Sequence, residues 1–392
     1  MSCEKIFLIA GEASGDQHAA DLVRNLKLLN QDLRVYAVGG EGLKRAGARI
    51  IVRSSELSVV GAVEVLHHIR PILKAYRRVV NWLESERPSL LILVDFPEFN
   101  LLIAKKAKAL GIPVFYFISP QIWAWRQGRV RKIKRLVDRM AVILPFEKDF
   151  YRNYGIDVEF VGHPLLDSVK PRMSREEFFN KFSIPGSARL VCLLPGSRSG
   201  EIRRHLNLFL KTAGKISRQH PDCSFCLPLA PGLSGDIERF INKGVRDFTK
   251  SSKLEVYLVR DSAHDAMAAS DLVIAASGTV TLEAAILRVP MIVTYRLAPL
   301  TYFAGRLLVR VKWVSLVNLI AGRQVVPEIL QDKAIPENLC DQALRLLEDH
   351  EARTAMIRQL DEIVGLLGKP GAAHRAASLV QSMLMQTHAD KA

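Results

Sequence analysis

Two short segments in the second half of the chain combine small residues with groups that bind phosphate and ribose. Pro195-Gly196-Ser197-Arg198 follows an apolar run, and Ser277-Gly278-Thr279 stands in the same position further along, with Glu283 one helical turn later. Amide groups at a helix start, a serine hydroxyl and an arginine form a seat for a diphosphate. A carboxylate in such a helix accepts ribose hydroxyls in other nucleotide folds. The residues predicted to bind a nucleotide are Gly196, Ser197, Arg198, Ser277, Gly278, Thr279 and Glu283.

A second candidate for chemistry lies in the first half, where the apolar run Leu90–Val94 ends at Asp95. Burial at the end of such a strand raises the pKa of a carboxyl group toward that of a general base. The alternative is that Asp95 caps the following helix, since aspartate is a favoured cap residue. Pro97 and Asn100 make this turn unusual, which favours a catalytic role.

Two further segments of the first half also follow apolar runs and are expected to face a substrate. Gly11–Asp16 lacks the GxGxxG fingerprint, and its two carboxylates suit hydroxyls or amides better than phosphate; a capped turn is the alternative. Ser119–Arg126 carries two tryptophans, whose faces pack on sugar rings or acyl chains. The basic run Arg126–Arg135 either neutralises a phosphorylated substrate or forms a solvated helix face. The residues expected on this side are Glu12, Ser14, Gly15, Asp16, Trp123, Trp125 and Arg126.

Short apolar runs alternate with helix-like segments along the whole chain. Such runs are typical of strands that are buried on both faces. The expected strands are Ile6–Ala10, Val35–Val38, Leu90–Val94, Val114–Ile118 and Ala141–Leu144, then Leu190–Leu194, Phe225–Leu229, Leu254–Leu258, Leu272–Ala275 and Met291–Val293.

The two series of runs predict an α/β protein with two Rossmann-like, doubly wound parallel sheets. Ligands of such sheets bind beyond the carboxyl ends of the strands, which is where the segments above lie. The expected domains are residues 1–168 on the acceptor side and residues 169–365 on the nucleotide side. Residues 366–392 are expected to form a helix and tail that return to the N-terminal domain.

The composition limits the classes of protein and partner. A chain of 392 residues with 49% hydrophobic residues has enough apolar surface for two domains. Its 55 Lys and Arg against 40 Asp and Glu give a net charge of +15, which favours phosphorylated or anionic partners. No zinc-finger, bZIP or RRM pattern accompanies this charge, so no nucleic acid partner is expected.

The cysteines and the apolar runs indicate a cytoplasmic protein that does not span a membrane. The five cysteines are odd in number and scattered, unlike a secreted disulfide framework. Cys223 and Cys226 form a nominal CxxC in an apolar run without a second pair at zinc spacing, so buried structural thiols are expected. No apolar stretch reaches bilayer length or resembles a signal peptide.

Several of these strings together resemble the lipid-A-disaccharide synthase family. The Gly-Glu-x-Ser-Gly-Asp and Trp-Ala-Trp-Arg strings are narrow to that family, whereas the nucleotide segments also occur across related sugar-nucleotide enzymes. The resemblance runs in the same order from about Ile6 to about Leu330. Its segments are Gly11–Asp16, Val94–Asn100, Ser119–Arg126, Leu144–Glu147, Val161–Pro164, Leu194–Arg198 and Ser277–Thr279.

The resemblance implies an inverting glycosyltransferase of the two-domain GT-B type, with its site in a cleft between the domains. Its substrates would be UDP-2,3-diacylglucosamine and 2,3-diacylglucosamine 1-phosphate (lipid X), and its products the β-1,6-linked tetraacyl disaccharide 1-phosphate of lipid A and UDP. Inverting transfer needs a base for the acceptor's 6-hydroxyl, assigned to Asp95, and support for departing UDP, assigned to Arg198. Because no Asp-x-Asp motif is present and helix dipoles offset diphosphate charge, no cofactor or metal is expected.

The segment between Leu57 and Val80 mixes apolar residues with arginine and lysine. Such a segment can lie on an anionic membrane surface, although ordinary core packing explains the same stripe. The doubly acylated substrates favour docking at the cytoplasmic face of the inner membrane by a peripheral protein. The oligomeric state is open, a homodimer being one option. The expected membrane contacts are Val60, Val63, Leu66, Ile69, Ile72 and Leu73.

Two other interpretations are open from the sequence. Another GT-B enzyme that uses UDP-N-acetylglucosamine, either a transferase to a lipid carrier or a 2-epimerase, would share the second domain. A non-catalytic nucleotide sensor or membrane adaptor would keep the fold. The presence of Asp95 and of paired nucleotide segments counts against that last class.

Overall fold

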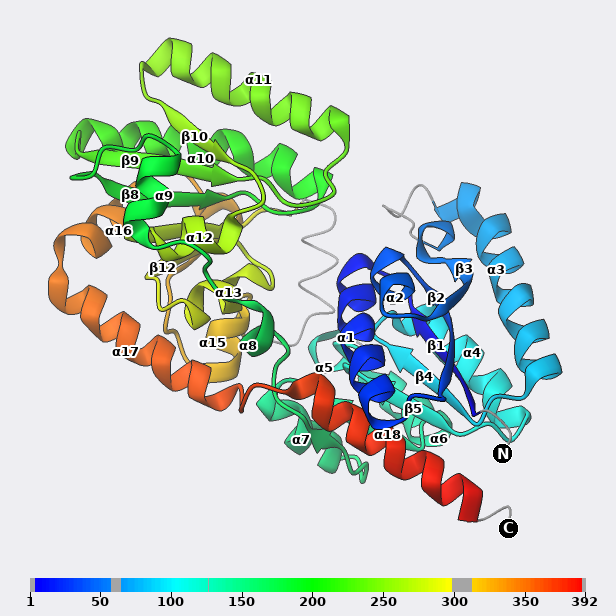
Figure 1. The fold of residues 1–392 in the computed structure, drawn as a ribbon. Coiled ribbons are helices and arrows are strands. Elements are labelled where there is room, and N and C mark those ends of the chain that lie inside the picture. Colours follow the sequence, from blue (N-terminus) through cyan, green and yellow to red (C-terminus); the bar gives the residue numbers. More distant parts are fainter. Residues whose placement is uncertain (1–3, 58–64, 126, 298–311, 390–392) are drawn as a thin grey trace. The chain divides into compact units, whose positions relative to one another are not determined.

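The chain forms two compact units. A computed structural model describes residues 4–57, 65–125, 127–297 and 312–389. Unit 1 comprises Met1–Pro164 and Leu367–Ala392, and unit 2 comprises Leu165–Leu366 (Figure 1). Each unit has its own parallel sheet, so the prediction of two doubly wound α/β sheets is confirmed.

Unit 1 is built on a seven-stranded parallel sheet with the order β3-β2-β1-β4-β5-β6-β7. Helices cover both of its faces, so the apolar runs of the central strands are buried throughout. Its strands are β1 (Lys5–Ala10), β2 (Arg34–Gly39), β3 (Arg49–Arg53), β4 (Leu90–Val94), β5 (Val114–Phe117), β6 (Arg139–Val142) and β7 (Glu159–Phe160). Its helices include α1 (Ala13–Leu29), α2 (Glu41–Arg45), α3 (Val65–Glu86), α4 (Pro97–Ala109), α5 (Ile122–Trp125), α6 (Val130–Leu136), α7 (Pro145–Arg152) and α18 (Ala372–Ala389).

Alternate residues of β1 enter two separate cores, as the pleat of a strand requires. Ile6 and Leu8 belong to the core formed with α1 and α18, and Phe7 and Ile9 belong to the core formed with α3 and α4. Helix α18 lies beside α1 although the whole of unit 2 separates them in sequence (Figure 1, red and blue). Leu384 is one of the residues that α18 buries there. The last helix of the chain therefore completes the core of the first unit.

Unit 2 is built on a six-stranded parallel sheet with the order β10-β9-β8-β11-β12-β13. Its strands are β8 (Arg189–Leu194), β9 (Cys223–Pro228), β10 (Val256–Val259), β11 (Leu272–Ala276), β12 (Met291–Tyr295) and β13 (Glu328–Leu330). Its helices include α8 (Leu165–Ser168), α9 (Arg175–Lys181), α10 (Ser199–Gln219), α11 (Gly235–Ser252), α12 (Ala263–Ala268), α13 (Val280–Ile286), α15 (Leu316–Ala321), α16 (Pro336–Glu348) and α17 (His350–Leu366).

In each sheet the strand order reverses at one point, between β1 and β4 in unit 1 and between β8 and β11 in unit 2. Connections on the two sides of such a point leave toward opposite faces, which opens a crevice at the carboxyl ends of the strands. Gly11–Asp16 and Asp95 directly follow β1 and β4, and Pro195–Arg198 and Ser277–Thr279 directly follow β8 and β11. The reversal therefore brings the two segments of each pair to neighbouring strand ends.

Strands β3, β7 and β13 are not predicted by the sequence; all of them are short and lie at sheet edges. Of the residues in β3, only Val52 is fully buried, so the strand has no apolar run. Cys192, Cys223, Cys226 and Cys340 are buried free thiols, as expected for structural cysteines. Within the described residues, no helix combines the length and apolar character needed to cross a membrane.

Packing of α18 on unit 1 can be measured with two neighbouring substitutions. Leu384 is 1% exposed and Met385 is 62% exposed. We expect Leu384→Ala to lower the free energy of unfolding by about 2–4 kcal/mol, because it removes buried methyl groups and leaves a cavity. Met385→Ala should change it by less than about 0.5 kcal/mol. Urea denaturation checks both, and equal effects would contradict the packing described.

Candidate active site

A cavity of about 330 Å³ opens at the switch point of unit 2, beyond the ends of β8 and β11. It contains every residue that the sequence predicted to bind a nucleotide. Glu201 and Tyr295 line it as well, as do the residues that follow β9. The predicted lining residues are Gly196, Ser197, Arg198, Ser277, Gly278, Thr279 and Glu283.

The Pro195–Arg198 loop brings the start of α10 to this cavity. Gly196 has a φ of +121°, and a Cβ there would lie 2.6 Å from the Cβ of Glu201, so only glycine fits. The loop leads into a 21-residue helix whose first amide groups have no partners within the helix. The Arg198 side chain is 73% exposed at the mouth of the cavity. The amide groups at the helix start and the Arg198 guanidinium can therefore bind an anion here.

His205, which the sequence analysis missed, fixes the base of this loop. Its Nε2 accepts the backbone N–H of Arg296 at 3.0 Å, so Nδ1 carries the proton and donates to the Pro195 carbonyl at 3.1 Å. Burial lowers the pKa of His205, which favours this neutral form. No spacing or motif in the sequence singles out His205, because its two partners come from different strand ends.

The second loop and its carboxylate are also held in place by neighbours. The Ser277 hydroxyl donates to the Val314 carbonyl at 2.9 Å, so this side chain orders the loop and its proton is not available to a phosphate oxygen. The Glu283 carboxylate lies 3.3 Å from Nε2 of His264, a second residue that sequence reasoning missed. Glu283 is half-buried and can accept hydroxyl groups from a ligand in the cavity.

Asp95 stands at the switch point of unit 1 in a strained backbone. Asp95 and Phe96 have φ values of +44° and +45°, a region that costs a non-glycine residue about 1–3 kcal/mol. Asn100 Nδ2 and the Tyr116 hydroxyl each donate to the Asp95 carbonyl at 2.6 Å. Burial raises the pKa of Tyr116, so this hydroxyl keeps its proton. Strain that is held by buried donors is typical of functional sites.

Asp95 is not the N-cap residue of α4, because Phe96 occupies that position. The Phe96 ring lies against Gly11, where a Cβ would come within 2.3 Å of the ring. Glycine at position 11 is therefore needed for the ring to pack there. Through this contact the turn after β1 packs against the turn after β4. The two predicted segments of unit 1 are therefore in direct contact.

Asp16 does not take the role predicted for it. It is 8% exposed, and its carboxylate accepts the backbone N–H of Gly40 at 2.6 Å and of Gly42 at 2.8 Å. These amides begin α2, so Asp16 stabilises that helix start instead of contacting an acceptor. Glu12 and Ser14 are exposed near the end of β1 and Gly15 is buried beneath them.

Trp123 is also a correction to the sequence prediction. It is 7% exposed, donates from Nε1 to Glu147 Oε1 at 3.1 Å, and packs edge-on against Phe146. This tryptophan is part of the core and does not present its face to a sugar ring or acyl chain. The Trp125 side chain and Arg126 lie outside the described residues.

Glu147 is a buried carboxyl group that the sequence analysis did not assign. It is 1% exposed, and its Oε2 accepts the backbone N–H of Leu144 at 2.9 Å and of Ile143 at 3.2 Å. Burial raises its pKa from 4.5 to about 7, although the Leu144 amide and the Trp123 indole act in the opposite direction. Glu147 therefore orders both the start of α7 and the loop that holds Trp123.

The proposed membrane segment divides between core and surface. Ile72 packs against the core, as the core-packing alternative predicted, whereas Leu73 is 48% exposed on α3. Arg70, Lys74 and Arg77 are exposed on the same helix. Val60 and Val63, and the side chains of Leu66 and Ile69, lie outside the described residues.

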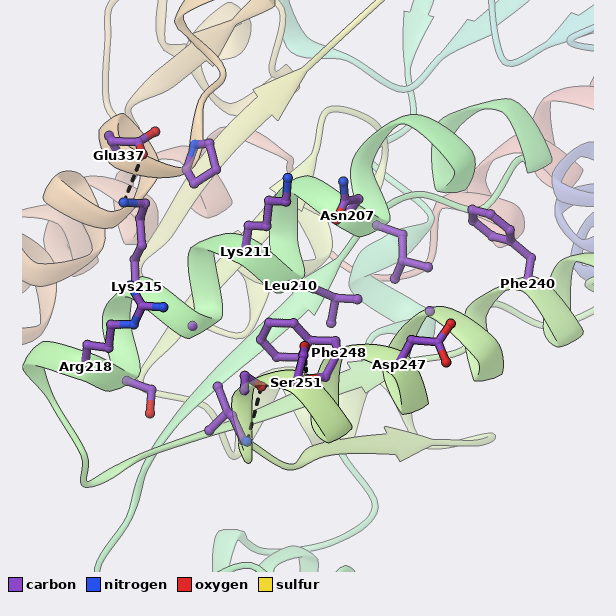
Figure 2. Close-up of a pocket in the computed structure, with 17 residues that line it drawn as sticks. Asn207, Leu210, Lys211, Lys215, Arg218, Phe240, Asp247, Phe248, Ser251 and Glu337 are labelled. Atoms are coloured by element: carbon purple, nitrogen blue, oxygen red, sulfur yellow. Dashed lines mark hydrogen bonds and ion pairs between the residues drawn. The ribbon is translucent and has the colours of Figure 1, made fainter.

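A larger hollow of about 1080 Å³ lies between α10 and α11 of unit 2 (Figure 2). Leu210 and Phe248 form its apolar floor, and Lys215 at its edge pairs with Glu337 at 2.9 Å. None of the predicted site residues lines it. The smaller cavity is therefore the candidate site. Within the described part of the chain, no group of three or more His, Cys, Asp or Glu residues is placed to hold a metal ion.

Comparison with known proteins finds relatives along nearly the whole chain. Residues 6–382 match the family model described as Lipid-A-disaccharide synthetase. The lipid-A-disaccharide synthase of Geobacter metallireducens is 43% identical over 381 residues, which cover 97% of this chain and 97% of that protein.

Solved structures resemble the chain in fold at much lower sequence identity. A glycosyltransferase from Rickettsia africae has a TM-score of 0.62 at 12% identity, covering 98% of this chain and 99% of that one. The UDP-GlcNAc 2-epimerase of Neisseria meningitidis, bound to UDP-GlcNAc, has a TM-score of 0.58 at 13% identity, covering 97% and 100%. At these identities the two structures establish the fold alone.

The raised pKa of Glu147 predicts a specific dependence of stability on pH. Between pH 4.5 and about 7 the folded protein holds this proton more tightly than the unfolded chain. The free energy of unfolding should therefore fall by up to about 3 kcal/mol as pH rises through this window. Glu147→Gln removes this contribution, and urea denaturation at pH 5 and pH 8 measures the difference between the two proteins.

The comparison with Glu147→Gln is needed because other groups titrate in an overlapping pH range. Burial lowers the pKa of His163 to about 4, which makes stability rise with pH between about 4 and 6.5. That contribution is common to both proteins and cancels in their difference. The same pH dependence in wild type and variant would refute the assignment to Glu147.

Proposed function

The chain belongs to the lipid-A-disaccharide synthase family, and on that premise we propose its substrates and the residues that act on them. It is a glycosyltransferase that makes the disaccharide of lipid A. The donor is UDP-2,3-diacylglucosamine and the acceptor is 2,3-diacylglucosamine 1-phosphate. The observation that carries this proposal is the presence of the family's strings at the strand ends of both switch points.

The cavity of unit 2 is the donor site. The amides at the start of α10 and the Arg198 guanidinium bind the diphosphate, and Gly278 and Thr279 offer a second helix start on the other side of the switch point. Glu283 binds the ribose hydroxyls, with His264 holding its carboxylate. The residues that line one cavity thus match the parts of one UDP-sugar.

Asp95 is the base for the acceptor. Its carboxylate takes the proton of the 6-hydroxyl while that oxygen attacks the anomeric carbon from the face opposite UDP. The bond to the β-phosphate oxygen breaks, and its electron pair leaves with UDP, whose charge Arg198 and the α10 amides stabilise. Glu12 and Ser14, both exposed near the end of β1, contact the acceptor. This mechanism requires no metal ion.

The other interpretations fit the observations less well. A 2-epimerase shares the fold at 13% identity, whereas a lipid-A-disaccharide synthase shares 43% over 97% of the chain. A nucleotide sensor or adaptor has no need for the strained backbone at Asp95 and its two buried donors. The doubly acylated substrates support a site of action at the cytoplasmic face of the inner membrane.

Replacing the base tests the proposal directly. We expect Asp95→Asn to lower turnover by at least about 100-fold, since it removes proton transfer, while leaving the Kd for UDP unchanged. Arg198→Ala should weaken UDP binding by about tenfold as well as slowing transfer. Asp149→Asn, which changes an exposed carboxylate on α7, is the matched control and should behave as wild type.

The assay combines both diacylated substrates, with and without EDTA, and detects the tetraacyl disaccharide by mass spectrometry. Calorimetry supplies the Kd for UDP. A wild type that forms no disaccharide would refute the substrate assignment, and loss of product with EDTA would refute metal independence. Near-normal turnover by Asp95→Asn would exclude Asp95 as the base.

Membrane docking through α3 makes a separate prediction. Leu73 is exposed beside Lys74, a pairing that suits an anionic membrane surface. We expect Leu73→Ser with Lys74→Ser to reduce binding to vesicles of anionic phospholipid by about tenfold. Leu102→Ser is the control, because Leu102 is 57% exposed on α4 of the same unit. Co-sedimentation measures binding, and an equal loss with the control would exclude docking through α3.

A further inference from the structure

Glu201 places a negative charge inside the proposed donor site. Its Oε2 accepts the backbone N–H of Ser197 at 3.2 Å and of Arg198 at 3.3 Å. Its Oε1 accepts the Tyr295 hydroxyl at 3.2 Å and lies 3.7 Å from the Arg198 guanidinium. The side chain is only 13% exposed, and these contacts hold it against the loop. A carboxylate thus occupies donors that the diphosphate is expected to use.

The charges that line the cavity make this position significant. Among the residues that the structure describes, the charged side chains lining it are those of Arg198, Glu201 and Glu283. The side-chain charge of these described residues therefore does not favour a diphosphate, and the attraction that they offer comes from amide groups and from Arg198. The Glu201 carboxylate contacts both the amide groups and the Arg198 guanidinium. Two anions that share donors at close range repel each other.

We propose that Glu201 is a resident anion of the donor site, whose carboxylate competes with the diphosphate and so limits the affinity for UDP. Without nucleotide, it occupies the amides of Ser197 and Arg198 and keeps the Pro195–Arg198 loop ordered. With nucleotide, its charge opposes the diphosphate and favours the departure of UDP after transfer. This inference rests on the proposed donor site.

A purely structural role for Glu201 predicts a different result. A glutamate in the first turn of a helix often accepts amide groups from the preceding residues and stabilises the helix start. If this were its whole function, any change that weakens those hydrogen bonds would disorder the loop and weaken nucleotide binding. Competition instead predicts that removing only the charge strengthens binding. The two roles therefore differ in sign.

Glu201→Gln separates these roles, because glutamine keeps the size and one acceptor oxygen and loses the charge. We expect it to bind UDP about tenfold more tightly than wild type and to be inhibited by UDP at correspondingly lower concentration. Glu337→Gln is the matched control, because it removes the same charge from the hollow of Figure 2, away from the donor cavity. It should bind UDP as wild type does. Calorimetry with UDP measures all three proteins.

Tyr295→Phe provides a second test that leaves Glu201 in place. It removes the hydroxyl that donates to the Glu201 carboxylate, so that carboxylate depends more on the loop amides and competes better. We expect UDP binding to weaken by about threefold, the opposite direction to Glu201→Gln. If Glu201→Gln does not fold, as judged by circular dichroism, Glu201→Ala takes its place: competition predicts tighter UDP binding, and a purely structural role predicts weaker binding.

The outcomes distinguish this inference from the proposed function. Tighter binding by Glu201→Gln with weaker binding by Tyr295→Phe supports competition. Unchanged or weaker binding by Glu201→Gln, or tighter binding by Tyr295→Phe, overturns it while leaving the donor site intact. A wild type that does not bind UDP refutes the donor site, and this inference with it.

Discussion

The reversal of strand order in each sheet is the constraint on which the site depends. Parallel strands bring their carboxyl ends to one edge, and helices that leave in opposite directions beside β1 and β8 keep that edge open. Residues that are far apart in sequence, such as Gly196 and Ser277, line one cavity for this reason. The buried apolar strands are thus the framework that gives the polar turns their positions.

Within that framework, backbone strain marks the residue that we propose as the base. Asp95 and Phe96 take left-handed conformations that neither residue favours. Asn100, Tyr116 and the close contact of Phe96 with Gly11 compensate for this cost. The donor side is built differently, since glycine supplies its tight turn at Gly196 without comparable strain.

The sequence was a good guide where a residue's role follows from its own position on a strand end. Apolar runs located the strands, and so Asp95 and the nucleotide segments could be placed at the switch points. Asp16 and Trp123 were assigned wrongly because their partners, Gly40 and Glu147, lie 24 residues further along the chain. No local pattern encodes such a pairing. His205 and His264 were missed for the same reason, since their contacts come from tertiary structure.

The net charge of the chain and the charge at the cavity have different effects on binding. The chain carries +15, yet the charged side chains that line the proposed donor cavity are, in the described part of the chain, those of two glutamates and one arginine. The positive charge of the chain acts at long range and favours encounter with anionic partners, whereas the affinity of the cavity depends on amides and carboxylates at contact distance. A transferase must bind UDP-sugar and then release UDP, which keeps the same diphosphate. In the proposed donor site, amide groups would bind the diphosphate and the Glu201 carboxylate would oppose it, which would meet both needs without an unduly stable product complex.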